Sequence, residues 1–160
     1  MAVADLIGAA VGVILLVIVA YMLVGGVIST AQIVTSAQKS ATLLEENQLK
    51  TDFSITNVTM IDSSDFSFTI NNTGNEPISD FTHMDVIAYD RSSNAYSLYP
   101  YSMSASTGKW TIVSQGNDLI HQSELYPGNS YIIEVMTTGL SPYWFQITTG
   151  NGVYASAFLQ

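Results

Sequence analysis

The segment Leu6–Ile28, LIGAAVGVILLVIVAYMLVGGVI, decides the fold, because it runs for 23 residues without a charged side chain. The next charge toward the C-terminus is Lys39. An α-helix rises about 1.5 Å per residue, so this segment would reach roughly 34 Å, enough to cross a hydrocarbon layer of about 30 Å. The segment is therefore predicted to be a helix that lies in a membrane or is buried in equally apolar surroundings.

The residues before this run do not form the basic start of an ordinary secretory signal. Asp5 is the only charged side chain there, and no Ala-x-Ala cleavage site is evident near the end of the run. Because basic residues normally set the orientation of a membrane anchor, we expect a short basic leader to have been removed before Met1. Sequencing the N-terminus of the native protein against the start codon of its gene tests this expectation.

The helical pattern continues beyond the apolar run, with no proline to interrupt it before about Lys50. Polar residues now appear, and the apolar ones recur at steps of three or four: Ile33, Val34, Ala37, Ala41 and Leu44. One helix is predicted, apolar all round in its first half and with one apolar stripe in its second half. Its weakest point is expected at Gly25-Gly26, since each glycine costs roughly 1 kcal/mol relative to alanine in a helix interior.

From Thr51 the hydrophobic period changes to two, as in Phe66, Phe68 and Ile70. Turn-forming residues separate eight such runs: 53–58, 66–70, 84–89, 96–101, 110–113, 131–136, 144–148 and 153–159. Strands and helices do not alternate here, which favours an antiparallel sandwich or barrel. The sequence thus predicts an α+β protein, with a hydrophobic and then amphipathic helix over 1–50 and an all-β, immunoglobulin-like sandwich or barrel head over 51–160.

The charge of the chain is strongly acidic and uneven. Its formal net charge is −9, of which residues 51–160 contribute −8 from 10 acidic and 2 basic residues. An acidic surface of this kind repels nucleic acid and anionic lipid, so nucleic-acid binding is excluded. The absence of cysteine excludes disulfides, thiolate metal sites and cysteine nucleophiles.

No constellation of residues in the sequence points to catalysis. There is no G-x-S-x-G turn and no Gly-rich loop between a strand and a helix. The pairs His83/Asp85 and His121/Glu124 lie far apart in sequence, so they predict surface polar groups rather than a metal site. Four acids near turns lack the spacing of a calcium loop and are expected to be solvated: Asp62, Asp65, Asp80 and Asp90. We therefore expect no enzyme activity, no bound metal and no cofactor.

Two N-x-[ST] sequons mark candidate glycosylation sites at Asn57 and Asn71. They have meaning only if the head lies outside the cell, where each glycan would add a bulky polar group to an exposed face.

A bare apolar N-terminus, a long unbroken helix and an acidic β-rich head together resemble the archaeal type IV pilin superfamily, which includes the archaellins. The matching residues are Ala2–Gly8, the apolar run to Ile28 and the polar stripe that follows it. Asp5 stands where pilins of the bacterial branch carry an acid near the mature start. In the head, the segments Asn71–Ile78 and Leu125–Asn129 look like turns found in archaellins and in archaellum stator proteins.

This resemblance implies a structural subunit of an extracellular helical filament for motility, the archaellum. Such a subunit is inserted in the membrane before assembly and polymerises with identical subunits through its N-terminal helix. In the resulting bundle, Gly8 and Gly12 are candidates for close helix contact because they have G-x-x-x-G spacing. Val13 and Leu16 are candidates for the dry packing face.

Two alternatives remain open within the same resemblance. One is an adhesive type IV pilin, whose filament is not rotated by a motor. The other is a membrane-anchored stator protein, whose head grips the surface layer while the helix stays in lipid. Burial of the amphipathic stretch 31–44 discriminates between them, because a filament requires it and an anchored module does not.

Overall fold

The computed structural model describes residues 2–115, 123–139 and 141–159, except for the side chain of Ala2. The chain divides into two compact units, with the boundary between Leu43 and Leu44. The first unit consists of helix alone. The second contains the last turns of the helix and all the strands.

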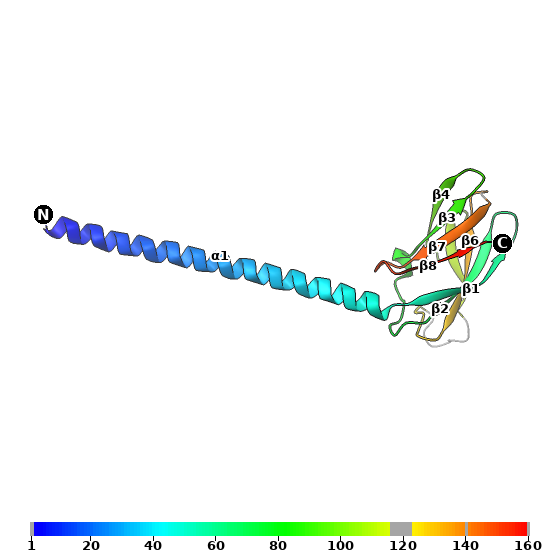
Figure 1. Ribbon diagram of the computed structural model, residues 1–160, viewed down its shortest axis with the longest axis horizontal. Helices are drawn as coiled ribbons and strands as arrows, with labels where there is room; N and C mark the ends of the chain where they lie inside the picture. Colours follow the sequence, from blue (N-terminus) through cyan, green and yellow to red (C-terminus); the bar gives the residue numbers. More distant parts are fainter. Residues whose placement is uncertain (1, 116–122, 140, 160) are drawn as a thin grey trace. The chain divides into compact units, whose positions relative to one another are not determined.

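Helix α1 (Ala2–Lys50) is a single element of 49 residues, as the sequence predicted (Figure 1). It continues through Gly25 and Gly26, so the glycine pair does not break it. No proline lies inside it, and most of its residues have good helix propensity, which offsets the cost of the two glycines.

Eight strands follow, in the eight regions expected from the period-two pattern. Their bounds are β1 (Phe53–Met60), β2 (Phe66–Asn72), β3 (Asp85–Asp90), β4 (Ala95–Pro100), β5 (Lys109–Ser114), β6 (Ser130–Met136), β7 (Pro142–Thr148) and β8 (Tyr154–Phe158). A single turn of 3₁₀ helix, η1 (Phe81–His83), precedes β3.

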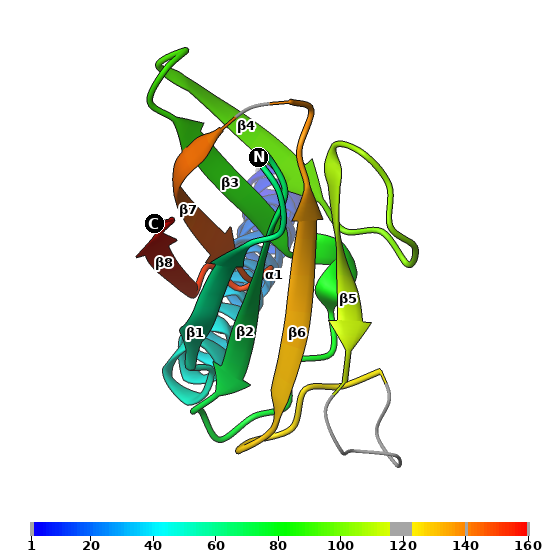
Figure 2. The same ribbon diagram turned by 90° about the vertical axis from the view of Figure 1, so that its right-hand side faces the viewer.

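The strands form two antiparallel sheets of four strands each, in the orders β1-β2-β6-β5 and β4-β3-β7-β8 (Figure 2). The head is therefore a sandwich, which resolves the choice between sandwich and barrel. The sandwich is nearly closed on both sides, because β1 lies near β8 and an isolated bridge joins Tyr101 to Trp110 between the β4 and β5 regions. Near-closure protects strand edges that would otherwise offer free backbone groups to other chains.

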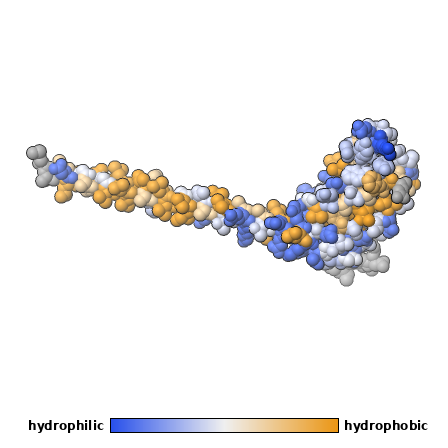
Figure 3. Space-filling view, in the orientation of Figure 1, coloured by the Kyte–Doolittle hydropathy of each residue, from blue (hydrophilic) through white to orange (hydrophobic). Residues whose placement is uncertain are grey.

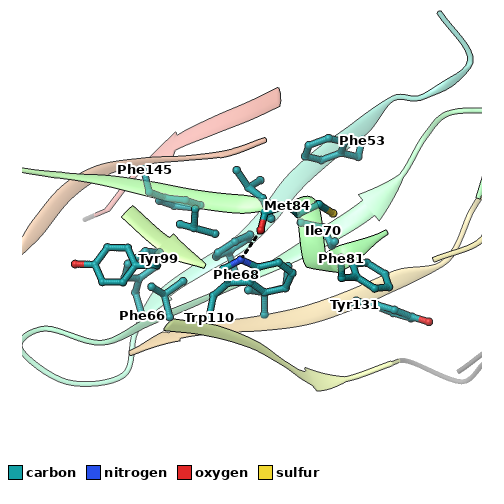
Figure 4. Close-up of a cluster of buried hydrophobic side chains, with 14 of the residues drawn as sticks. Phe53, Phe66, Phe68, Ile70, Phe81, Met84, Tyr99, Trp110, Tyr131 and Phe145 are labelled. Carbon is teal, nitrogen blue, oxygen red and sulfur yellow. Dashed lines mark hydrogen bonds between the residues drawn. The ribbon is translucent and has the colours of Figure 1, made fainter. Parts of the chain in front are cut away.

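Aromatic side chains from both sheets form the centre of the core (Figure 4). Phe66 and Phe68 of β2 pack on Phe145 of β7, with ring centroids 4.9 Å and 4.5 Å apart. Trp110 of β5 is fully buried, and its indole nitrogen donates a hydrogen bond of 3.1 Å to the carbonyl of Met84, just before β3. This bond satisfies the one polar group of the tryptophan while it joins the two sheets.

The end of α1 is held within the head unit by the loop that follows β2. The amide nitrogens of Thr73 and Gly74 donate to the carbonyl of Asp52, and that of Asn75 donates to the carbonyl of Lys50 at 2.8 Å. Gly74 has to be glycine, because a Cβ atom there would lie 2.5 Å from two backbone atoms of this joint. A free carbonyl at the helix C-terminus thus receives a donor from the head.

The buried side chain of Asn72 holds this loop in place through hydrogen bonds. Its side chain is 1% exposed, and its amide donates to the carbonyls of Glu76 (2.9 Å) and Leu125 (2.7 Å). Its side-chain oxygen accepts a hydrogen bond of 2.9 Å from the amide of Gly74. The segments that resemble archaellin turns are therefore linked to each other through one buried amide.

Candidate assembly surfaces

The most prominent surface of the chain is the apolar surface of α1. Every described side chain from Val3 to Leu49 is exposed, and Figure 3 shows apolar residues, in orange, along the first half of the helix. Val13 is 60% exposed and Leu16 is 71% exposed. Within the described part of the chain, α1 is the one helix long and apolar enough to cross a membrane. A contiguous apolar surface of this size needs an apolar environment, because soluble monomers rarely expose one.

Gly8 and Gly12 make no close packing contact with the rest of the described chain. A Cβ atom built at either position meets nothing within 4 Å beyond its chain neighbours and the local helix backbone. Glycine in a helix interior costs about 1 kcal/mol relative to alanine, and the surrounding chain does not offset that cost. Close approach by another helix, predicted from the G-x-x-x-G spacing, remains a prediction for both residues.

The second half of α1 is polar in sequence, but four of the six hydroxyl groups between Ser29 and Thr42 are already hydrogen-bonded within the helix. Four of them donate to carbonyls one turn earlier, at 2.9–3.0 Å: Thr30 to Gly26, Thr35 to Ala31, Ser36 to Ile33 and Thr42 to Gln38. Burying a hydroxyl without a partner costs several kcal/mol in an apolar medium. These four hydroxyls keep an acceptor on burial, because each already donates to a carbonyl of the same helix. These four hydroxyl groups can therefore enter a helix bundle with little loss of hydrogen bonding.

The two sequons lie on neighbouring strands of one sheet. Asn57 is exposed, has a positive φ of 50°, and sits where β1 bulges away from β2 between Thr56 and Thr59. Asn71 is half-buried on β2, and its side-chain nitrogen donates to the hydroxyl of Thr56 at 3.0 Å. Asn57 is therefore the more accessible acceptor of the two.

Of the four acids expected to be solvated, Asp62 and Asp90 accept hydrogen bonds from their own turns, and for Asp90 the expectation was wrong because it is buried. Asp65 is half-buried and accepts from the amide of Thr137. An oxygen of Asp62 accepts from the amides of Ser64 and Asp65 at 2.8 Å, and these hydrogen bonds lower the pKa of Asp62. Asp90 accepts from the hydroxyl and amide of Ser92, which lowers its pKa in the same way. The carboxylates of Asp62 and Asp90 each replace a turn hydrogen bond, as Asp commonly does.

Of the two histidine pairs considered from the sequence, only His83/Asp85 lies wholly within the described residues, and its histidine contacts a different carboxylate. His83 lies in η1 and contacts Asp80, 2.7 Å away, rather than Asp85 at the start of β3. Hydrogen bonds from Thr82 and then from His83 hold the pKa of Asp80 below its usual value. The spacing of three residues is the signal for this pair, since one 3₁₀ turn brings such residues together. His121 lies outside the described residues, and among those described no group of three potential metal ligands occurs.

Two solved structures are similar to this chain in fold. The archaellum periplasmic stator protein FlaG from Sulfolobus acidocaldarius matches with 22% identity and a TM-score of 0.51, over 68% of this chain and 99% of that one. The stator complex of FlaF and FlaG from the same organism gives 21% identity and a TM-score of 0.50, over 67% of this chain and 87% of that one. A search among curated proteins finds no match.

The family comparison covers far more of the chain than these structures do. The model of archaeal-type flagellin matches residues 4–155, which include α1 and nearly the whole sandwich. This match confirms the resemblance seen in the N-terminal run and in the turns of the head. The chain therefore belongs to the archaeal-type flagellin family.

Proposed function

We propose that this archaellum subunit forms the filament itself, by polymerising with identical copies through α1. The observation that carries the proposal is the exposure of apolar side chains over the whole first half of α1 and along a stripe of the second. At about 1.5 Å per residue, α1 is roughly 70 Å long, more than twice a hydrocarbon core of about 30 Å. Lipid therefore covers only part of it, and neighbouring helices supply cover for the rest.

The two halves of α1 fit two stages of this process. Before assembly, the apolar first half lies in the membrane. On assembly, lipid is exchanged for neighbouring helices, and the stripe that includes Ile33 and Leu44, 66% and 60% exposed in the single chain, is buried as well. In this proposal residues 1–50 are the polymerisation segment, residues 51–160 are the head on the filament surface outside the cell, and the role is structural rather than catalytic.

The alternative with a specific observation in its favour is a membrane-anchored stator module. The sandwich is similar in fold to the stator protein FlaG. An anchored module, however, leaves the stripe from Ile33 to Leu44 facing water. An adhesive pilus uses the same helix contacts as an archaellum and differs in whether a motor rotates the filament.

The response of filaments to salt and detergent tests the proposed polymerisation. Burial of each 1,000 Å² of apolar helix surface contributes about 25 kcal/mol before the entropy of association is subtracted. The heads carry −8 each by sequence, and their repulsion, screened beyond about 8 Å at physiological ionic strength, reaches farther in low salt but stays smaller than the apolar contribution. We therefore expect purified filaments to survive dilution into low salt and to come apart in a detergent that solvates helices.

Filament length measured by negative-stain microscopy across both series provides the readout. If shearing native cells releases no filaments, and the protein is monomeric in detergent, these results would instead support the anchored module. Disassembly on dilution of salt, with no effect of detergent, would show that contacts between heads hold the polymer.

Glycosylation of the head is a second expected property of an extracellular subunit. We expect glycans at Asn57 and Asn71 in the native host, with fuller occupancy at Asn57 because it is exposed on the bulge of an edge strand. Peptide mass spectrometry on material from the source organism measures both sites. Thr59→Ala should remove the glycan at Asn57 and Thr59→Ser should keep it, because only the second preserves the sequon. An intact mass equal to the bare chain of 17.3 kDa would refute the prediction.

A further inference from the structure

The outer faces of the two sheets have opposite chemistry. On the sheet β1-β2-β6-β5, the outward residues in register include Ile132 and Glu134 but are mostly hydroxyl or amide side chains: Ser54, Thr56, Ser67, Thr69, Asn71 and Ser130. Both sequons lie on strands of this sheet. Side chains of this kind, with a glycan added, suit a surface that faces water.

Figure 2 shows the order of the strands in the other sheet, β4-β3-β7-β8. Aromatic and aliphatic residues gather on its outer face, beside Gln146, Thr148 and Ser156. The strand registers place four aromatic side chains in one row across all four strands: Tyr96, Tyr89, Trp144 and Phe158. The next row begins with Leu98 and Ile87. We call these six residues the aromatic face.

The outer ends of the aromatic face are exposed in the described part of the chain. Tyr96 is 69% exposed, Phe158 is 61% exposed and Leu98 is 58% exposed. Tyr89 packs on Tyr96 with ring centroids 4.9 Å apart, so the rings support one another along the row. Exposed apolar residues that gather in one patch mark an interaction surface more often than residues scattered singly.

None of the six residues of the aromatic face is charged, and strands β4, β7 and β8 contain no charged residue. Strand β3 carries two acids: Asp90 is buried and hydrogen-bonded to Ser92, and Asp85 lies on the same outer face, in the row beyond Ile87. In a head of charge −8, the aromatic face is thus an uncharged surface on which another acidic head can approach with little repulsion.

We propose that the aromatic face packs against the head of a neighbouring copy of this chain in the filament. The inference rests on the proposed function, because it assigns a head contact to the same polymer. A second copy fits the low charge of the face, whereas a cationic partner would bind better to the acidic remainder of the head. In a helical polymer the contact is heterologous, so the aromatic face meets a different surface of the next copy.

The size of the face explains why the contact belongs to a polymer rather than to a free dimer. Four strands about 4.8 Å apart and five residues of about 3.3 Å each give roughly 300 Å² in plan. A stable interface buries about 800 Å² on each partner. Isolated heads are therefore expected to remain apart, and the contact forms once α1 holds the copies at a high effective concentration.

A matched pair of substitutions tests the proposal in the full chain. Leu98 on β4 and Val113 on β5 are both exposed aliphatic residues on edge strands, at 58% and 57%, one on each sheet. We expect Leu98→Asp to reduce filament number or length about tenfold, the change that corresponds to loss of one well-packed interface residue. Val113→Asp should leave filaments unchanged. Equal effects of the two substitutions, or no effect of Leu98→Asp, would overturn the assignment.

Cross-linking identifies the occupant directly, because the chain has no cysteine of its own. A benzophenone maleimide attached at Leu98→Cys should capture a second copy and double the 17.3 kDa chain mass, while the same label at Val113→Cys should not. Capture of a protein of another mass, or no capture, contradicts the proposal. The two failures are distinguishable: absence of filaments from the native chain overturns the proposed function, whereas labelled filaments that give no doubled mass overturn only the contact through the aromatic face.

Discussion

Filaments should be absent from cells that express only the Val13→Asp variant, and equally from cells that express only Leu16→Lys. Both side chains are exposed in the single chain and lie in the apolar first half of α1. In a bundle of such helices, each substitution would bury a charge without a partner, at a cost of several kcal/mol. The cost recurs at every subunit, so a polymer is far more sensitive to it than a single contact would be.

The control variants keep the site apolar. Val13→Ile and Leu16→Met should preserve filaments in cells, which negative-stain microscopy can count. The membrane fraction should be blotted as well, because a charge in the apolar run also opposes insertion by about 3 kcal/mol. A variant that reaches the membrane and forms no filament isolates the assembly step. Filaments of normal length from either charged variant would show that this side of α1 is not buried.

The secondary structure was predictable because it depends on local patterns. The apolar run and the absence of proline gave the helix, and period-two alternation gave all eight strands. Alternation also separates buried from exposed residues within β4. Tyr99 points inward and is buried, whereas Tyr96 and Leu98 point to the other face and are exposed. The expected weakness at Gly25-Gly26 did not break the helix, because two glycines cost about 2 kcal/mol in a helix of this length.

The pairing of the strands was not predictable from the sequence. Strand β2 pairs with β6, more than 60 residues later, and the choice depends on which faces pack together in the finished core. The aromatic face could not be predicted from the sequence either, because the strands that contribute its row of four aromatic residues are separated along the chain. The close contacts predicted for Gly8 and Gly12 would involve helices of other copies, and they remain a prediction.

Asn72 is the clearest residue that sequence reasoning missed. In the sequence it reads as the middle of the sequon at Asn71 and as part of a polar turn. Its burial depends on the segment at Leu125, whose carbonyl accepts from its side chain across 53 residues of chain. An asparagine that precedes Thr-Gly-Asn is ordinarily exposed, so a long-range partner is needed to explain this one.

Asn72→Asp should destabilise the head by about 3–5 kcal/mol at neutral pH, because it replaces a buried amide with an ionised carboxylate. The carboxylate has no hydrogen to donate, so it faces the carbonyls of Glu76 and Leu125 without the two hydrogen bonds of 2.9 Å and 2.7 Å. For a head of this size, each kcal/mol shifts the melting temperature by about 4–8 °C. Melting of the full chain in mild detergent, followed by tryptophan fluorescence, reports the head alone, because both tryptophans, Trp110 and Trp144, lie in it.

The neighbouring substitution Asn71→Asp provides the matched control, since it makes the same chemical change one residue away. Asn71 is half-buried and makes one side-chain hydrogen bond, to Thr56, so its replacement should cost about 1 kcal/mol or less. Burial beside two carbonyls raises the pKa of the carboxyl introduced by Asn72→Asp above that of an unfolded chain, about 3.9. The folded variant then binds the extra proton as the pH falls. The loss of unfolding free energy relative to the native chain should therefore be largest above the raised pKa and become smaller toward acid pH. If the loss of stability is equal for both variants, or does not change with pH, the Asn72 amide does not hold the loop after β2 in place.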